Sequence, residues 1–185
     1  MVEQTVDRFG ALHVMVPNAG VGAPAPLLAM DLAAWREVMA VNLDGVFLAI
    51  RHAAPAIIAA GGGSVVTIAS VTANAGSPLM AHYAAAKAAV VNLTKTAAIE
   101  LRDQGVRVNA VVPGFIGTDL VRATAPAIDE HLGPGGFDAL ITRKLGRYGT
   151  PTEVAEAVHF LAGPRSSFCT GTALVLDGGL EASLL

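Results

Sequence analysis

Four short apolar segments recur along the chain and predict the strands of a sheet. They are rich in Val, Ile and Leu, and their apolar residues are continuous rather than alternating with polar ones. Continuous apolar runs are typical of strands that are covered on both faces, as in a parallel sheet between two layers of helices. The predicted strands span residues 12–16, 64–69, 106–112 and 172–176.

Segments with helical spacing of apolar residues separate these strands. One helix is predicted from residue 32 to about residue 60, with Asp31 as its N-cap and Pro55 distorting its later turns. Two more are predicted over residues 81–103 and 152–162. Alternating strands and helices indicate an α/β fold with a doubly wound parallel sheet in three layers.

Residues 114–149 interrupt this regular alternation. The segment holds several Pro and Gly residues and two short amphipathic pieces between two predicted strands. A long ordered excursion in a compact domain is usually functional, so we expect a lid. The whole chain, residues 1–185, is otherwise predicted to be a single domain.

Composition narrows the function classes. The chain is 53% hydrophobic and 15% charged, with a formal net charge of −3. This balance excludes general disorder and argues against a nucleic-acid partner. The most apolar stretch, residues 46–60, contains Arg51, His52 and Pro55, so neither a membrane span nor a membrane partner is expected.

Cysteine and histidine usage add two expectations. The single Cys169 cannot form an internal disulfide, and the first ten residues lack the features of a secretion signal. We therefore expect a reducing, cytoplasmic location. The five histidines show no paired metal-ligand spacing, so no metal site is predicted.

Chemically capable residues follow the predicted strands, where ligands of parallel α/β sheets bind. Tyr83 and Lys87 are four residues apart on one helix face, so the ammonium is expected to lower the pKa of the phenol. Ser70, at the end of a predicted strand, can donate to a carbonyl oxygen that the phenol would protonate. The other candidates at strand ends are Asn18, Ala19, Gly20 and residues 113–118.

Each candidate also has a structural interpretation. Tyr83 and Lys87 as an isolated pair would be typical of a surface helix, and Ser70 could merely cap a strand end. Asn42 could hydrogen-bond the helix that contains it. Thr118 could cap a short helix that begins near residue 119.

Taken together, these residues resemble the classical short-chain dehydrogenase/reductase family over essentially the whole chain. The resemblance implies a Rossmann-like fold and an NAD or NADP cofactor. It also implies that Tyr83 is the general acid/base, Ser70 holds the substrate oxygen, and Lys87 tunes Tyr83 and binds the nicotinamide ribose. The implied catalytic set is Asn42, Ser70, Tyr83 and Lys87, and the implied cofactor contacts are Asn18, Ala19, Gly20, Tyr83, Lys87, Pro113, Gly114, Ile116 and Thr118.

The sequence departs from the family pattern in its cofactor-binding half. No Thr-Gly-x-x-x-Gly-x-Gly turn is present, so we expect the N-terminal strands to be absent and dinucleotide binding to be weakened. Pro17 stands where the family usually has a second Asn. Two hypotheses remain: an oxidoreductase that interconverts an alcohol and a ketone or aldehyde, or an inactive, truncated homologue acting as a fold fragment or interaction module.

Substrate and assembly can be predicted in outline. Val71, Thr72, Leu79, Met80, Phe115 and the lid are expected to form the wall of a pocket for a moderately apolar alcohol or ketone. The family's helices pack in pairs across a two-fold axis. The Ala-rich helices at residues 32–60 and 81–102 therefore predict a homodimer or homotetramer.

Overall fold

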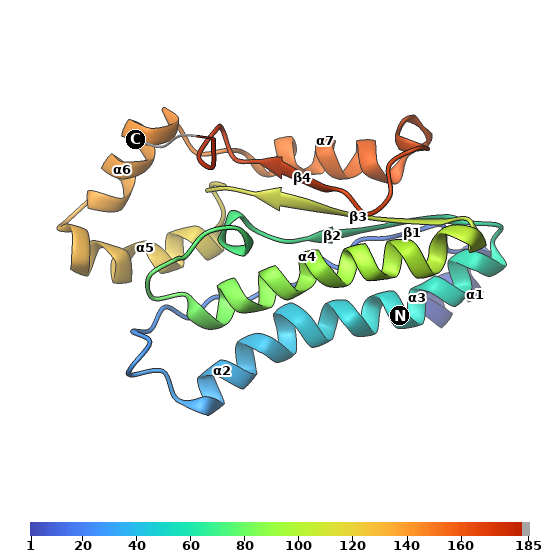
Figure 1. Ribbon diagram of the computed structural model, residues 1–185, viewed down its shortest axis with the longest axis horizontal. Coiled ribbons are helices and arrows are strands. Elements are labelled where there is room, and N and C mark those ends of the chain that lie inside the picture. Colours follow the sequence, from blue (N-terminus) through green and yellow to red (C-terminus); the bar gives the residue numbers. More distant parts are fainter. Residues whose placement is uncertain (183–185) are drawn as a thin grey trace.

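Four parallel strands form the sheet in the computed structural model, which describes residues 1–182 (Figure 1). They lie side by side in the order in which they occur along the chain, with Ser64 paired to Arg107 and Ala110 to Ala173. The predicted parallel α/β sheet is therefore confirmed, although the first strand is shorter than predicted. The strands are β1 (Val14–Met15), β2 (Gly63–Ile68), β3 (Val106–Pro113) and β4 (Ala173–Leu176).

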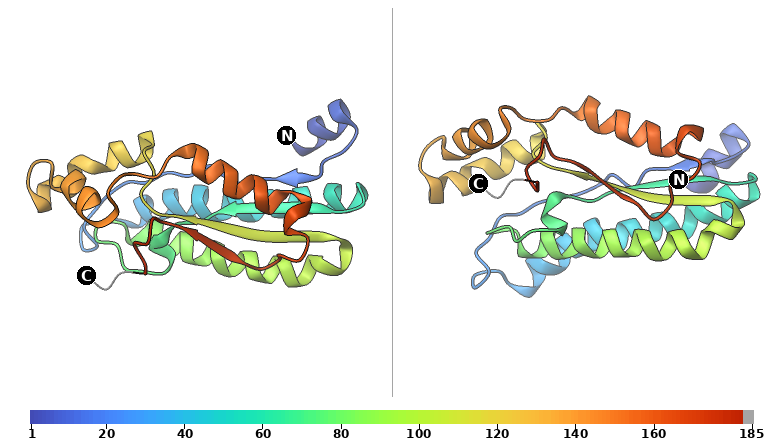
Figure 2. Two further views of the ribbon diagram at one scale, coloured as in Figure 1. Left: turned by 90° about the horizontal axis from the view of Figure 1, so that it is seen from above. Right: turned by 45° about the horizontal axis from the view of Figure 1, so that its top comes forward.

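Helices cover both faces of this sheet, which gives the predicted three layers (Figure 2). The helices α3 and α4 pack beneath β2 and β3, and α7 packs above the same strands. A short N-terminal helix that sequence analysis did not predict contacts α3. The bounds are α1 (Val2–Phe9), α2 (Leu32–Met39), α3 (Gly45–Ala59), α4 (Ala81–Leu101) and α7 (Pro151–Ala162).

The core explains why the strand sequences are continuously apolar. Val65 and Val108 belong to the hydrophobic cluster between the sheet and helices α3 and α4, whereas Val66 and Val111 belong to the cluster between the sheet and α7. All four side chains have 0% of their surface exposed. Burial of successive residues on opposite faces requires apolar side chains at every position, which removes the alternation of a half-exposed strand.

The helix predicted over residues 32–60 contains an irregular turn. A π-helical segment, η1 (Ala40–Asp44), joins α2 to α3, while α3 continues through Pro55. The departure from α-helical hydrogen bonding is thus at Asn42 rather than at the proline. Leu32–Ala59 is long and apolar enough by composition to cross a membrane, and 33% of its most apolar window is buried inside the fold. Part of that burial comes from the packing of α3 against β1, β2 and β3.

The excursion over residues 114–149 contains the two amphipathic pieces expected from the sequence. They form α5 (Asp119–Leu132) and α6 (Gly136–Leu145), which pack against each other. Backbone hydrogen bonds close the base of the excursion: Gly117 N–H donates to Gly149 O at 2.9 Å, and Gly149 N–H to Phe115 O at 3.0 Å. Its two ends are therefore fixed to each other beside the carboxyl end of β3.

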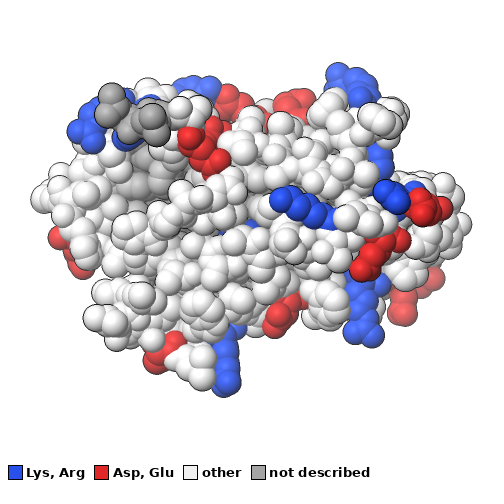
Figure 3. All heavy atoms as spheres, viewed as in Figure 1, with Lys and Arg blue, Asp and Glu red and all other residues white. Residues whose placement is uncertain are grey.

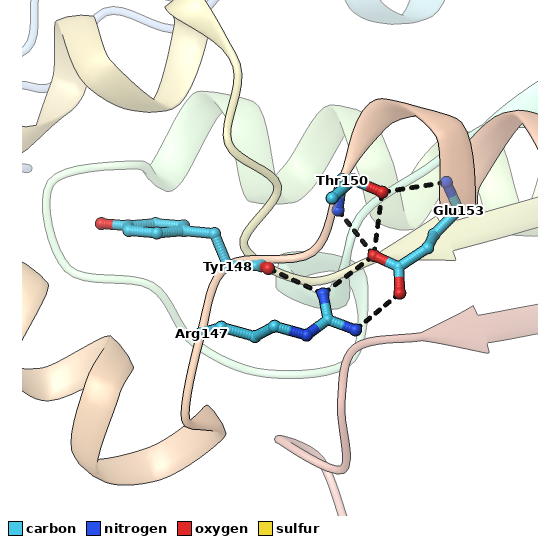
Figure 4. Close-up of polar contacts among 4 residues, drawn as sticks. All are labelled: Arg147, Tyr148, Thr150 and Glu153. Carbon is cyan, nitrogen blue, oxygen red and sulfur yellow. Dashed lines mark hydrogen bonds and ion pairs between the residues drawn. The ribbon is translucent and has the colours of Figure 1, made fainter.

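The start of α7 is built differently from the prediction, which placed Thr152 there. Thr150 is the N-cap: its hydroxyl accepts from Glu153 N–H at 3.2 Å, and Glu153 accepts from Thr150 N–H at 2.8 Å. Glu153 also forms a two-point ion pair with Arg147, which lies just before the helix (Figure 4). This capping box anchors the end of the excursion to α7.

Charged side chains are sparse on the face seen in Figure 3, where broad uncharged areas separate scattered Lys, Arg, Asp and Glu. The uncharged surface includes large apolar side chains on the helical layer. Phe47 and Leu48 of α3 and Ile99 of α4 have 45%, 46% and 66% of their surface exposed.

Candidate active site

A cavity of about 1000 Å³ opens at the carboxyl ends of the strands and contains most of the predicted site residues. Its lining brings together residues that follow β1, β2 and β3 and the first turns of α4. The predicted residues on its wall are Asn18, Ala19, Gly20, Ser70, Tyr83, Lys87, Pro113, Gly114, Ile116 and Thr118. Asn42 is not on the wall but directly behind Gly20.

Tyr83 and Lys87 are placed by the first two turns of α4. The Lys87 ammonium lies 5.5 Å from the centre of the Tyr83 ring and donates a 2.8 Å hydrogen bond to the carbonyl oxygen of Ile68. Lys87 is 3% exposed, and no carboxylate is paired with it among residues 1–182. The pair is therefore part of the cavity, and the surface-helix interpretation is wrong.

The protonation behaviour of this pair corrects the prediction from spacing. Burial raises the pKa of the Tyr83 phenol above its ordinary value of 10.0, and the neighbouring Ser70 hydroxyl acts in the opposite direction. Burial also lowers the pKa of Lys87 to about 8. The predicted net lowering of the Tyr83 pKa is wrong, because the cost of removing the phenolate from water outweighs the hydrogen bond from Ser70.

Ser70 lies two residues after the end of β2, where the chain turns toward α4. Its backbone is extended, and its hydroxyl accepts a 3.3 Å hydrogen bond from Thr72 N–H, so it caps the short helix η2 (Val71–Ala73). The hydroxyl hydrogen stays free to donate into the cavity. The capping role and the donor role are thus compatible in one side chain.

Asn42 fastens the loop after β1 to the irregular turn η1. Its amide nitrogen donates to Val21 O and to Val38 O, both at 2.9 Å, and its oxygen accepts from Val21 N–H at 3.3 Å. A Cβ atom on Gly20 would lie 2.8 Å from that oxygen and 3.8 Å from the Lys87 nitrogen. The loop backbone can lie this close to Asn42 only because Gly20 lacks a side chain.

Residues 113–118 form the opposite wall. Thr118 is the N-cap of α5, and its hydroxyl accepts a 3.4 Å hydrogen bond from Val121 N–H. Gly114 packs on Asp177, where a Cβ atom would come within 2.9 Å of the Asp177 backbone. The structural interpretation of Thr118 is therefore confirmed, and the residue also lines the cavity.

The predicted pocket wall is wrong in part. Val71, Thr72, Leu79 and Met80 are not among the residues that line the cavity. Phe115 packs edge-to-face on Phe137 at 5.2 Å and lines a separate hollow of about 530 Å³. The predicted contribution of the lid is confirmed in part, since Leu120 and Val121 do line the cavity.

Sequence analysis missed one whole side of the cavity. Helix α7 presents a stripe of six residues to it, and Val14 of β1 and Val16, just after this strand, also line it. The spacing of the stripe, with members three and four apart, was visible in the sequence but could not reveal which element the helix faces. The stripe consists of Pro151, Val154, Ala155, Val158, His159 and Ala162.

The lining is mostly uncharged, and its donors suit a polar organic ligand. Among the described residues on its wall, Lys87 is the one Lys or Arg, and no Asp or Glu is present. Residues 1–182 also contain no group of three His, Cys, Asp or Glu that could hold a metal ion. The available chemistry is proton exchange by a phenol beside a hydroxyl donor and an amine.

Comparisons with known proteins agree with this geometry. A family model described as enoyl-(acyl carrier protein) reductase matches residues 1–181. The chain is 39% identical to cis-4-hydroxycyclohexanecarboxylate dehydrogenase of Sinomonas cyclohexanicum, over 98% of this chain and 71% of that protein. It is 41% identical to the 3-oxoacyl-(acyl-carrier-protein) reductase FabG of Thermotoga maritima, over 97% and 70%.

A solved structure shares the fold as well as the sequence. The gluconate 5-dehydrogenase of Burkholderia cenocepacia, in complex with NADP and tartrate, superposes with a TM-score of 0.90 at 34% identity. The match covers 99% of this chain and 70% of that one.

Proposed function

This chain belongs to the short-chain dehydrogenase/reductase family of oxidoreductases, and from that premise we propose that it is an NAD(P)-dependent enzyme interconverting an alcohol and a ketone or aldehyde. The observation that carries the proposal is the meeting of Ser70, Tyr83 and Lys87 on one wall of the cavity. They come from two separate parts of the chain, Ser70 from the segment after β2 and the other two from the first turns of α4. A purely structural cluster would not need a phenol, a hydroxyl and an amine that all reach the same open space.

The cavity fits a nicotinamide cofactor on one side of these groups. Gly20 of the loop after β1 lines it, and Lys87 supplies a cation within the wall. Residues 18–20 and 113–118, with Tyr83 and Lys87, would hold the cofactor. When bound, its nicotinamide supplies or accepts the hydride.

Tyr83 exchanges the proton at its hydroxyl oxygen. Because burial raises the pKa of the phenol, it is protonated near neutral pH and can donate to the oxygen of a ketone. Ser70 donates a hydrogen bond to the same substrate oxygen and holds it beside the phenol. A donor aimed at a developing oxyanion stabilises the transition state more than the ground state.

Lys87 and Asn42 support this pair. Lys87 in its charged form stabilises the phenolate left behind by proton donation and binds the ribose of the cofactor. Asn42 holds the loop after β1 in place through Val21. In this proposal it is also the member of the proton relay that lies beyond Lys87.

The substrate end of the cavity favours an uncharged, moderately apolar molecule. Leu120, Val121 and Ile116 supply apolar surface, and the described wall offers no arginine for a carboxylate. A relative from Acinetobacter, 41% identical, is named cyclohexanol dehydrogenase, and uncharged alicyclic secondary alcohols are therefore the first candidates.

Turnover assays test the proposal. Initial rates with cyclohexanol and 4-substituted cyclohexanols, with NAD⁺ and NADP⁺ each at millimolar concentration, should show alcohol-dependent production of NADH or NADPH. The Tyr83→Phe variant is the control. Absence of turnover in both directions with every alcohol and ketone would overturn the proposal in favour of an inactive interaction module.

Cofactor affinity is expected to be weak for this chain. The described cavity wall contains a single Lys and no Arg to meet a pyrophosphate, and the glycine run 61–63 lines a different hollow. Calorimetry should give a dissociation constant well above the micromolar range. Micromolar binding of NAD(H) or NADP(H) would contradict this expectation.

The exposed apolar residues on α3 and α4 support self-association. Phe47, Leu48 and Ile99 would be covered in a homodimer or homotetramer formed through these helices. Light scattering at micromolar concentration should give at least a dimer, and a monomer would contradict it. A cytoplasmic location is also part of the proposal, resting on the single cysteine and its free state.

A further inference from the structure

His82, the residue immediately before Tyr83, is completely buried and takes no part in the chemistry described above. It lies on the stripe of α4 that faces the sheet, with Ala86, Val90 and Thr94 one, two and three turns further on. Its ring nitrogen Nδ1 accepts a 2.8 Å hydrogen bond from Tyr83 N–H. Imidazole therefore satisfies a backbone donor in the first turn of the helix that carries the phenol.

The beginning of α4 has few other fixed contacts. The first N–H groups of a helix lack intrahelical acceptors, and the N-cap residue Met80 supplies no side-chain hydrogen bond. Leu79, just before it, has a φ of +66°, a strained conformation for a residue with a branched side chain. The chain thus turns sharply into the helix, and no conventional cap sets its first turn.

A histidine at position 82 destabilises the folded state through one ring nitrogen, and the hydrogen bond of its other ring nitrogen explains why a histidine is nevertheless useful there. Because Nδ1 accepts a hydrogen bond, the ring carries its hydrogen on Nε2, and Nε2 is buried with no partner among residues 1–182. An unpaired buried donor destabilises the folded state, which a leucine of similar size would avoid. What the histidine adds at this place is the acceptor beside Tyr83.

We propose that His82 is a positioning residue for Tyr83, which fixes the first turn of α4 and thereby the place of the phenol against Ser70. This inference rests on the proposed function for its catalytic consequence. The hydrogen bond itself is independent of that function. A misplacement of about 1 Å between reacting groups can cost on the order of 100-fold in rate, so a single cap can matter for turnover.

Three substitutions separate the acceptor from the bulk of the ring. In His82→Asn the amide oxygen occupies the place of Nδ1, so the hydrogen bond to Tyr83 N–H can re-form. His82→Leu keeps the volume without an acceptor, and His82→Gln moves the polar group to the place of Nε2. Val90→Ala is the matched control, because it weakens the packing of the same stripe of α4 two turns away.

Amide hydrogen exchange reads the cap without any assay of activity. We expect exchange at Tyr83 N–H to be at least about 10-fold faster in His82→Leu and His82→Gln than in the parent, and to recover in His82→Asn. Val90→Ala should leave it near the parent rate when compared at equal global stability. An exchange rate in His82→Leu no faster than in Val90→Ala would overturn the proposal.

Phenol titration and kinetics read the position of Tyr83. In a Tyr148→Phe background, absorbance titration reports Tyr83 alone, because the chain has two tyrosines. The Tyr83 pKa should fall toward its ordinary value in His82→Leu and return in His82→Asn, and kcat should fall about 10- to 100-fold with little change in KM. An equal Tyr83 pKa and equal kcat in the Asn and Leu variants would overturn the proposal. A parent without turnover would overturn the proposed function, and the role of His82 would then be decided by hydrogen exchange and phenol titration.

Discussion

The Lys87 ammonium is hydrogen-bonded at 2.8 Å to the carbonyl oxygen of Ile68, the last residue of β2. This contact ties α4 to the sheet at the edge of the cavity, where the chain turns from β2 to Ser70. The carbonyl is neutral, so the charge of Lys87 is solvated by one peptide dipole instead of water. Burial therefore dominates, and the pKa of Lys87 falls to about 8.

Stability should rise with pH across the range in which Lys87 titrates. Between about pH 8 and pH 10.5 the unfolded chain still holds this proton while the folded chain has released it, so raising the pH favours folding. The slope is up to about 1.4 kcal/mol per pH unit. Urea unfolding at pH 7 and pH 9.5 should show this rise in the parent and in Lys95→Met, an exposed control on α4, but not in Lys87→Met. An equal slope in Lys87→Met would contradict the assignment.

Removal of the phenol hydroxyl should abolish turnover without unfolding the protein. We expect Tyr83→Phe to lower kcat by about 10³-fold, because a positioned general acid typically contributes 10²- to 10⁴-fold. Ser70→Ala should lower it by about 10²-fold, the usual effect of losing one oxyanion donor. Both should melt within a few degrees of the parent. Retained turnover in Tyr83→Phe would show that another group exchanges the proton.

The same phenol should give the two reaction directions different pH dependence. Because its pKa is raised, Tyr83 is protonated at neutral pH and suited to donate a proton during ketone reduction. Alcohol oxidation needs the deprotonated form, so its rate should increase from pH 6 to pH 9. Initial rates measured in both directions test this, and an oxidation rate that falls over this range would contradict it.

The sequence predicted most of the fold because its signals were local. The continuous apolar runs identified β2 and β3 almost to the residue, and the helix over residues 81–103 ends within two residues of α4. The irregular turn at Asn42 was not predicted, since a π-helical turn leaves no mark on apolar spacing. Its cause is tertiary: the Asn42 side chain bonds Val21, a residue on another segment.

The sequence predicted which residues come together in the site, but not the pKa shifts of those residues or all the elements that line the cavity. Spacing placed Tyr83 and Lys87 on one helix face, yet the pKa shifts depend on how deeply both are buried, which spacing does not encode. The contribution of α7 to the cavity depends on how that helix crosses the sheet. His82 appeared in the sequence as one of five unpaired histidines.

A methyl group on Gly20 should disrupt the loop after β1. In Gly20→Ala the new Cβ atom would lie 2.8 Å from the Asn42 oxygen, so the amide must move and weaken its bonds to Val21. We expect a loss of about 1–3 kcal/mol in unfolding free energy. The control is Gly45→Ala, where the new Cβ atom would meet Ala40 O at an ordinary 3.6 Å and a helix should gain up to about 1 kcal/mol. Equal melting temperatures for the two variants would contradict the close approach.

The capping box of α7 can be tested with two neighbouring threonines. Thr150→Ala removes the hydroxyl that accepts from Glu153 N–H and should cost about 1 kcal/mol, or roughly 2–4 °C in melting temperature. Thr152→Ala, in the first turn and exposed, should change the melting temperature by less than half as much. A larger loss from Thr152→Ala would place the helix start where the sequence alone suggested it.

The carboxyl group of Glu153 should also make the stability of the protein depend on pH in the acid range. Hydrogen bonds from Arg147 and Thr150 lower the pKa of its carboxyl group to about 2, from an ordinary 4.5. Its stabilising contribution is therefore present above pH 4.5 and is lost as the pH falls through about 2. Melting curves from pH 5 to pH 2 should fall less steeply for Glu153→Gln than for the parent, and parallel curves would contradict the assignment.

The strand β1 lies at one edge of the described sheet. In the described sheet it pairs with β2 on one side alone, and Val14 and Val16 have 39% and 36% of their surface exposed. An edge strand with exposed valines and no charge can pair with another chain. We therefore expect this chain to aggregate at concentrations at which a variant with a charged edge strand stays soluble.

A charge on this strand should suppress the aggregation. Val14→Lys places an ammonium on the exposed edge. Pairing with another chain would bury this charge, so the variant should have a higher soluble fraction after concentration, measured by light scattering. Val175→Lys, on the edge strand β4 with the same 39% exposure, is the matched control and should help less. Hydrogen exchange over residues 12–16 should be fast in a dispersed sample and slow in an associated one. Slow exchange in a soluble monomer that melts cooperatively would show that the edge is protected within one chain, and the expectation of pairing through β1 would then be wrong.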